Sequence, residues 1–282
     1  MPLTLNESLI YSTVKITMMV NGRPVETGTG FFWNAAPKPD QVVLCIVTNK
    51  HVIAGADAVV LRFHLAKDET IAEPSGRFSD YIVAIDHQDV VGHPDVNVEL
   101  CAFGIAGVTP DLAGKGETLF YRSLAAVNVP TQADWSNFDA IEDVLMIGCP
   151  NGIVDEANNR PIVRRGITAT QMSQRYNGKP EFMVDMACFP GSSGSPVFLN
   201  QLGYIDRATN NYMMDARRFF IVGVLYAGPL INNQGTITFG HAPSIQVASM
   251  MHLGNVVQSG ELLTLNQEII KRLSTPVLLP KP

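Results

Sequence analysis

The sequence predicts an all-β fold. Its apolar residues fall in short runs rich in Val, Ile and Phe, and turn signals such as Asn21-Gly22, Asn177-Gly178 and Asn233-Gln234-Gly235 separate them. Of the 282 residues, 46% are hydrophobic and 16% are charged, which is typical of a compact folded chain rather than a disordered one. A chain of this length can bury a full core in one or two domains.

The first half of the chain contains several predicted strands. Residues 9–20 alternate between apolar and polar positions and predict the first of them. Gly28–Trp33 is a strand punctuated by glycines, and we expect it to pair with the apolar run Gln41–Thr48 across a short loop. Another short apolar strand, Leu100–Phe103, completes this half.

The second half continues the pattern and ends in helical spacing. Residues 104–140 predict a connection with local structure of its own, and a second set of strands is expected from about Ile141 to about Ala242. Within that set, the polar stretch Leu202–Arg217 predicts an irregular connection. The apolar spacing of residues 245–254 and of residues 264–273 predicts helices that end before the C-terminal proline-rich tail.

The segment Phe189–Pro196 reads FPGSSGSP and carries the clearest chemical signal. Attack on a carbonyl needs a hydroxyl on a tight turn beside unpaired backbone N–H donors. Gly191 permits the turn and Gly194 permits a close backbone approach, because neither has a Cβ. This interpretation makes Ser193 a nucleophile and the N–H groups of Gly191 and Ser193 an oxyanion hole. The alternative is an ordinary Gly/Ser loop between strands.

A histidine stands at the end of a predicted strand. The run QVVLCIVT ends in Asn49-Lys50-His51, and a turn of small residues follows. A strand that carries a histidine to its own end holds a general base rigidly, so His51 is the candidate base. The alternative is a structural or merely exposed histidine.

Three blocks of sequence carry a resemblance to a known family: Gly28–Trp33 (GTGFFW), Cys45–Ala56 (CIVTNKHVIAGA) and Phe189–Phe198 (FPGSSGSPVF). They resemble the trypsin-like serine peptidases of the chymotrypsin fold, in particular the bacterial HtrA/Deg proteins and the intracellular proteins with a trypsin-like peptidase domain. The resemblance follows the order of the family over about residues 10 to 250.

The resemblance implies an all-β fold of two six-stranded antiparallel β-barrels (chymotrypsin-like) with a C-terminal helix. It implies an N-terminal barrel over residues 1–128 that carries the histidine and the acid. It also implies a C-terminal barrel over residues 129–256 that carries the nucleophile, and a helix with a tail over residues 257–282.

The residues leave three alternatives open for the acid of the implied triad. The family places it at the start of a short apolar strand, which puts Glu99 in that position, one residue before Leu100. Asp95 lies four residues earlier in the preceding loop and is the second candidate. A third alternative is that neither carboxylate completes the triad.

The resemblance also suggests a substrate pocket. Ala187 stands six residues before Ser193, where trypsin has the acid that binds a basic side chain. An apolar pocket floor disfavours a buried cation, so we expect small or medium apolar side chains at the cleaved position. The strand Val222–Gly228, with Gly223, is expected to form another wall. Ser192 stands where the digestive enzymes carry an aspartate, so activation by a new N-terminal amine is not expected.

Composition argues against several other functions. The formal net charge is −6, from 20 basic and 26 acidic residues, and no basic stripe indicates a nucleic-acid partner. No run approaches about 20 apolar residues, so we expect no membrane span.

One short stretch is crowded with residue types that can bind metals: Asp86, His87, Asp89, His93 and Asp95. These residues lack the spacing of a zinc motif. We therefore expect a solvated polar loop, no metal and no cofactor.

The four cysteines lie in apolar, strand-like settings and predict buried free thiols. The N-terminus lacks the basic and apolar regions of a secretion signal. Together these features predict a cytoplasmic protein, and the resemblance to HtrA/Deg proteins implies a bacterial one.

The leading hypothesis is a serine endopeptidase that cleaves peptides or proteins through an acyl-enzyme on Ser193, with His51 as base and Glu99 orienting it. The second hypothesis is an inactive relative that binds peptides with the same cleft. A regulatory partner or a homo-oligomer is compatible with either, although no residue of the chain identifies one.

Overall fold

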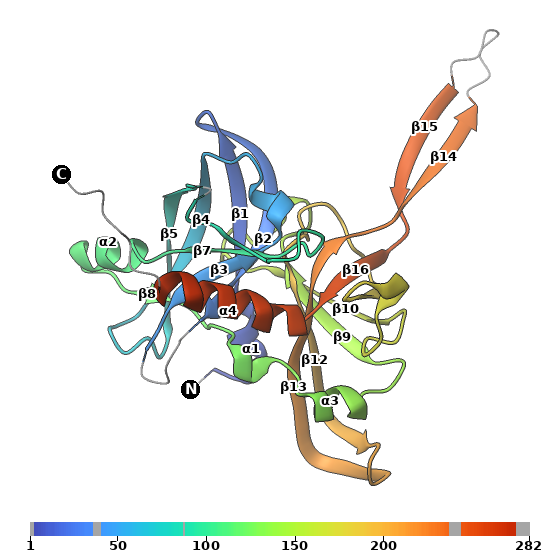
Figure 1. The fold of residues 1–282 in the computed structure, drawn as a ribbon. Helices are drawn as coiled ribbons and strands as arrows, with labels where there is room; N and C mark the ends of the chain where they lie inside the picture. The colour runs from blue at the N-terminus through green and yellow to red at the C-terminus, as the bar shows by residue number, and fades with distance from the viewer. Residues whose placement is uncertain (1–2, 36–40, 87, 237–243, 275–282) are drawn as a thin grey trace.

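The computed structural model of the protein describes residues 3–35, 41–86, 88–236 and 244–274. Figure 1 shows two β-rich halves, with helix α4 (Gly260–Ser274) running from the second half across the first. Two hairpins project from the second half, one at either end of it. Within the described residues, no helix is long and apolar enough to cross a membrane.

The N-terminal half is an eight-stranded antiparallel sheet in the order β5-β4-β1-β2-β3-β7-β6, with β8 paired to β4. The strands are β1 (Thr13–Val20), β2 (Arg23–Asn34), β3 (Leu44–Thr48), β4 (Ala58–Ala66), β5 (Pro74–Ala84), β6 (Val91–Gly92), β7 (Cys101–Gly104) and β8 (Leu119–Phe120). The predicted pairing of β2 with β3 is confirmed, since Phe31 lies opposite Val47 and Trp33 opposite Cys45.

The C-terminal half is a closed antiparallel barrel in the order β10-β11-β16-β13-β12-β9. Its strands are β9 (Asp143–Gly148), β10 (Ile162–Thr168), β11 (Glu181–Asp185), β12 (Pro196–Asp206), β13 (Asn211–Ala227) and β16 (Leu253–Gln258). The predicted all-β class with two antiparallel halves is therefore confirmed. The N-terminal half differs in detail, because its eight described strands follow an open path rather than a ring of six.

Two local predictions are wrong. The stretch Leu202–Arg217 is a long hairpin with one irregularity between Leu202 and Tyr204, because β12 and β13 continue to pair beyond the barrel as far as Asp206 and Asn211. Residues 245–254 are not helical: β15 (Ser244–Met250) pairs in register with β14 (Leu230–Thr236), and β16 follows. In both segments tertiary strand pairing overrides the local sequence pattern.

The helical segments are short except for α4, which confirms the helix predicted over residues 264–273. They are α1 (Leu5–Ile10), α2 (Val108–Gly114) and α3 (Gln132–Asn137), with 3₁₀ turns η1 (Lys50–Ile53), η2 (Ala126–Asn128), η3 (Pro150–Gly152) and η4 (Tyr176–Gly178). The first strand starts later than predicted because Thr4 and Glu7 form a capping box that begins α1. The predicted connection over residues 104–140 has the expected local structure, with α2, β8, η2 and α3.

A shared hydrophobic core joins the two halves. It combines residues of the N-terminal sheet such as Trp33 and Val47 with barrel residues such as Phe198 and Val224. The apolar face of α4 adds Leu262, Leu265 and Ile269 to the same cluster. The buried interface fixes the end of β3, which leads to His51, relative to the turn before β12 that carries Ser193.

Candidate active site

His51 lies in the turn η1, directly after strand β3. The strand ends at Thr48, and the fully buried Asn49 connects it to the turn. The side-chain amide of Asn49 donates to the backbone carbonyl of Glu99 at 2.6 Å. The imidazole of His51 is 43% exposed, so a substrate can reach it.

Glu99, and not Asp95, lies beside the imidazole. Nδ1 of His51 is 2.9 Å from Oε2 of Glu99, and the backbone N–H of His51 donates to the same oxygen at 3.2 Å. The Asp95 carboxylate instead accepts the backbone and side-chain N–H groups of Asn97 at 2.9 and 3.1 Å, which hold the pKa of Asp95 below its ordinary value. Because Nδ1 faces the carboxylate, Nε2 is the nitrogen that remains for chemistry.

Ser193 lies on a tight turn between two glycines with positive φ, Gly191 at 82° and Gly194 at 88°. A Cβ on Gly194 would lie 1.9 Å from the carbonyl oxygen of Thr29, so only glycine permits this approach. The Ser193 hydroxyl donates to the carbonyl of Tyr226 at 3.2 Å. Within the described part of the chain, no hydrogen bond joins it to His51.

The N–H groups of Gly191 and Ser193 have no acceptor among the described residues. The carbonyl oxygens of the preceding residues are occupied: that of Pro190 by the N–H of Asn151 at 2.5 Å, and that of Ser192 by the N–H of Ser195 at 3.0 Å. In a trans peptide the N–H and the C=O point in opposite directions. The N–H groups of Gly191 and Ser193 therefore point away from the residues that bond to the carbonyls of Pro190 and Ser192. This arrangement can hold a developing oxyanion.

Thr29 connects the nucleophile turn to the N-terminal sheet. Its N–H donates to the carbonyl of Ser193 at 2.9 Å, and its hydroxyl donates to the carbonyl of Gly191 at 2.8 Å. The same hydroxyl accepts the N–H of Cys149 at 2.9 Å, while the carbonyl of Thr29 accepts the hydroxyl of Thr48 at 2.7 Å. One buried residue therefore braces the turn against the strand that leads to the histidine.

Tyr226 borders the site from strand β13. Its phenol donates to Oε2 of Glu181 at 2.5 Å. Burial first, and then the hydrogen bond to Glu181, raise the pKa of Tyr226, so the phenol stays neutral. Glu99 is close enough to add to the same effect.

Thr29, Asn49 and Tyr226 were not singled out from the sequence. Thr29 sits between Gly28 and Gly30, and this flanking by glycines was its one visible signal. Asn49 and Tyr226 gave no comparable signal, because their roles depend on contacts with residues far away in the chain.

The two residues of the predicted substrate pocket lie in different surroundings. Ala187 is partly buried between β11 and the nucleophile turn. Gly223 lies inside the barrel wall, where a Cβ would be 2.3 Å from the carbonyl oxygen of Val257 and 2.4 Å from a methyl group of Val256. Their role in a pocket stays a prediction.

A cavity of about 370 Å³ adjoins the candidate oxyanion hole. It is lined in part by Gly191 and Asn151 on the barrel side and by Glu26 and Thr27 of β2 on the sheet side. The cavity therefore lies between the two halves, next to the turn that carries Ser193.

In the polar stretch around His93, Asp86, Asp89 and Asp95 are exposed as expected, whereas His93 is not. His93 is only 6% exposed and lies beneath α4, while His87 lies outside the described residues. In the part of the chain that the structure describes, no three His, Cys, Asp or Glu side chains come together as a metal site.

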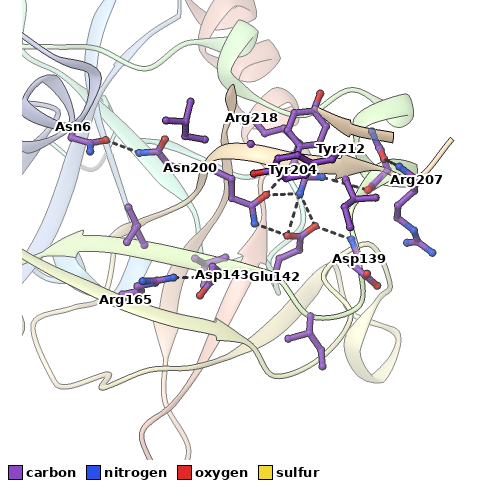
Figure 2. Close-up of a pocket in the computed structure, with 18 of the residues that line it drawn as sticks. Asn6, Asp139, Glu142, Asp143, Arg165, Asn200, Tyr204, Arg207, Tyr212 and Arg218 are labelled. Carbon is purple, nitrogen blue, oxygen red and sulfur yellow. Dashed lines mark hydrogen bonds and ion pairs between the residues drawn. The ribbon is translucent and has the colours of Figure 1, made fainter. Parts of the chain in front are cut away.

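Figure 2 shows a separate cavity of about 890 Å³, where β9 and β10 face the long β12–β13 hairpin. At its base Glu142 and Arg218 form a buried ion pair at 3.1 Å, and Gln201 bonds to both. The N–H of Asp139 completes the set of donors to Glu142. Because these buried charges are paired, the cluster offers no free reactive group, and loss of either partner would leave an uncompensated charge at the base of the hairpin.

Comparison with known proteins assigns the family. The sequence matches the trypsin-like peptidase domain over residues 28–205, more than half of the chain, so the protein belongs to that family. This match confirms the resemblance to trypsin-like serine peptidases and supports a peptidase acting on peptides or proteins. No curated protein matches the sequence.

Three of the solved structures that match this chain are proteases. The serine endoprotease from Yersinia pestis is 15% identical, with a TM-score of 0.49 over 96% of this chain and 68% of that one. The Rv3671c protease in its inactive form is 15% identical, with a TM-score of 0.42 over 93% and 89%. The active form of the Rv3671c protease from M. tuberculosis is 13% identical, with a TM-score of 0.42 over 93% and 82%.

Proposed function

We propose that the protein is a serine endopeptidase in which His51, Glu99 and Ser193 form the catalytic triad. The N–H groups of Gly191 and Ser193 form the oxyanion hole. The proposal depends chiefly on the 2.9 Å contact between Nδ1 of His51 and Oε2 of Glu99. A carboxylate in that position fixes the imidazole tautomer and stabilises the imidazolium that forms during the reaction.

The reaction follows from these positions. Nε2 of His51 takes the proton of the Ser193 hydroxyl while Oγ attacks the substrate carbonyl, and the resulting oxyanion accepts the two free N–H groups. The imidazolium then gives its proton to the leaving amine as the C–N bond breaks, which leaves an acyl group on Ser193. Water, deprotonated by the same imidazole, then attacks the acyl carbonyl, and the imidazolium returns the proton to Oγ of Ser193 as the acyl C–O bond breaks and the carboxylic acid leaves.

One movement must precede attack. The Ser193 hydroxyl donates to the carbonyl of Tyr226, so the side chain has to release that acceptor and turn toward His51. Catalytic hydrogen bonds are commonly loose before substrate binds and form in the complex. Bound peptide backbone that competes for the Tyr226 carbonyl offers a reason for the serine to turn.

The surroundings suggest the kind of substrate. Ala187 presents no charge to a side chain that precedes the cleaved bond, which favours small or medium apolar residues there. The cavity beside Gly191 offers room for residues that follow the cleaved bond.

A second function is an inactive relative that holds peptides in the same cleft. The observation that favours it is the engaged hydroxyl of Ser193, which is bonded to Tyr226 rather than to His51. A protein that kept this state with peptide bound would bind without cleaving.

Incubation with a mixed peptide library, read by mass spectrometry, tests the two functions. We expect new termini that accumulate with wild-type protein and disappear with Ser193→Ala. Retention of intact peptides by both proteins, with no new termini, would favour the binding function. Cleavage that persists in Ser193→Ala would contradict the proposed nucleophile.

A further inference from the structure

A buried contact joins helix α4 to the loop that leads to Glu99. Nε2 of His93 lies 2.9 Å from Oε2 of Glu261, with the His93 side chain 3% exposed and the Glu261 side chain 20% exposed. Nδ1 of His93 accepts the backbone N–H of Asp95 at 3.1 Å. Since Nδ1 is the acceptor, the neutral ring carries its hydrogen on Nε2, which lies within ion-pair distance of the Glu261 carboxylate but makes no hydrogen bond of good geometry among the described residues.

The loop from His93 to Glu99 is a closed unit. Its ends meet because the N–H of His93 donates to the carbonyl of Leu100 at 2.9 Å. The ammonium of Lys50, the residue before the proposed general base, donates to the carbonyls of His93 and Asp95 at 3.2 and 3.0 Å. A displacement of His93 would therefore move the loop that carries the carboxylate as a whole.

Helix α4 is a firm support for this contact. Leu262, Leu265 and Ile269 bury its apolar face in the core that both halves share. The indole N–H of Trp33 donates to the side chain of Asn266 at 2.8 Å. The helix directly follows β16 of the barrel, so Glu261 belongs to the half that also carries Ser193.

We propose that Glu261 is a positioning residue for the proposed catalytic acid. Through His93 it fixes the loop that ends in Glu99, and thereby the direction from which that carboxylate meets the imidazole of His51. The barrel that carries the nucleophile thus sets the geometry of the base and acid on the other half. This inference rests on the proposed peptidase function for its effect on turnover.

Peptidase kinetics of the full chain give the first test. Glu261→Ala should lower kcat by about tenfold to a hundredfold, with KM changed less than about twofold, because a displacement of about 1 Å is enough for such a loss. Glu261→Gln keeps an oxygen acceptor for His93 and should stay within about threefold of wild type. Glu268→Ala, on the same helix at a residue paired with Lys271, is the matched control and should leave kcat unchanged.

A second test separates positioning from general destabilisation. If Glu261 acts through Glu99, then Glu261→Ala should cause no further loss of kcat in a Glu99→Gln background. An equal loss in both backgrounds would overturn the proposal, as would an unchanged kcat in the single variant. If Glu261→Ala does not fold, Glu261→Asp, which shortens the side chain and keeps its charge, should give a smaller loss with the same dependence on Glu99.

A third test needs no enzymatic activity. In protein labelled with ¹⁵N-histidine, the Nδ1–H of His51 should give a downfield, hydrogen-bonded proton resonance in wild type and in Glu261→Gln. Glu261→Ala should lose this resonance or move it upfield, and Glu268→Ala should not. An unchanged resonance in Glu261→Ala overturns the positioning role, whereas absence of peptidase activity with the expected NMR change overturns the proposed function alone.

Discussion

A single oxygen of Glu99 contacts His51 twice. Oε2 lies 2.9 Å from Nδ1 of the ring and accepts the backbone N–H of the same residue at 3.2 Å. The first contact orients the imidazole, and the second holds the start of the turn that carries it. Because one charged oxygen serves both contacts, removal of its charge weakens the position and the tautomer of the histidine together.

Glu99→Gln should lower kcat about 10³- to 10⁴-fold, because the amide favours the wrong tautomer of His51 while leaving the shape of the site intact. Steady-state cleavage of a peptide identified from the library measures the change. Asp95→Asn is the matched control and should stay within a few fold of wild type, since Asp95 bonds to Asn97. A large loss in Asp95→Asn with a normal Glu99→Gln would assign the acid to Asp95.

Ser193→Ala should abolish labelling by a fluorophosphonate probe, because the probe reacts with an activated serine hydroxyl. The neighbouring Ser192 provides the control, since its hydroxyl is buried and has no hydrogen-bond partner among the described residues. Ser192→Ala should therefore label like wild type, as judged by gel fluorescence and intact mass. Equal labelling of Ser193→Ala and wild type would show that the probe reacts elsewhere.

Thr29→Val should destabilise the fold, because it leaves the buried carbonyl of Gly191 and the N–H of Cys149 without their partner. Each unsatisfied group costs about 1–3 kcal/mol, and each kcal/mol lowers Tm by about 2–4 °C in a chain of this size. Thr209→Val, at an exposed turn, should leave Tm nearly unchanged. Equal Tm values for the two variants, measured by circular dichroism, would mean that the Thr29 hydroxyl does not brace the nucleophile turn.

Gly194→Ala and Gly116→Ala form a matched pair. Both glycines have positive φ, so either alanine costs about 1–2 kcal/mol of backbone strain. At Gly116 a Cβ meets nothing within 4 Å, whereas at Gly194 it meets the carbonyl of Thr29 at 1.9 Å and the hydroxyl of Thr48 at 2.5 Å. Gly194→Ala should therefore lose at least about 1–3 kcal/mol more than Gly116→Ala in urea unfolding. Similar midpoints would contradict the tight contact.

The sequence alone predicted correctly those features that depend on a short local stretch of chain. Glycine-bounded turns and β-rich runs gave the all-β class, and a strand ending in His51 placed that residue at the mouth of the site. Counting back from the apolar strand at Leu100 selected Glu99, and the structure shows that this carboxylate reaches the imidazole. The β-rich class and the place of His51 needed only backbone periodicity and residue type, whereas the choice of Glu99 also needed the position that the family resemblance implies for the acid.

The sequence did not predict those features of secondary structure, burial and side-chain contact that depend on segments far apart in the chain. Residues 245–254 have helical spacing, yet they form strands because β14 offers a partner. His93 looked like part of a solvated loop, yet it is buried, with Glu261 of α4 beside its ring. The contact of Ser193 with Tyr226 depends on a side-chain rotation that no sequence pattern encodes.

The four cysteines should make the folded state less stable as the pH rises, and burial should keep their thiols unreactive while the protein is folded. All four are buried and free, as predicted, and burial raises the pKa of Cys45, Cys101, Cys149 and Cys188 from 9.0 to about 12. Burial disfavours the thiolate, so the folded state holds protons that the unfolded chain releases. The stabilising effect is therefore complete below pH 9 and is lost progressively as the pH rises toward 12.

Two measurements check this expectation. At pH 8 the folded protein should resist iodoacetamide, while all four thiols should react once guanidinium unfolds the chain, because the reactive species is the thiolate. Urea midpoints should be constant between about pH 7.5 and 8.5, a range in which all four thiols are protonated in the folded state. They should fall between about pH 9.5 and 11. Replacing one of these buried thiols through Cys45→Ala should reduce that fall. A folded protein that alkylates at the rate of free cysteine at pH 8 would contradict the burial, and a midpoint that rises with pH would contradict the sign.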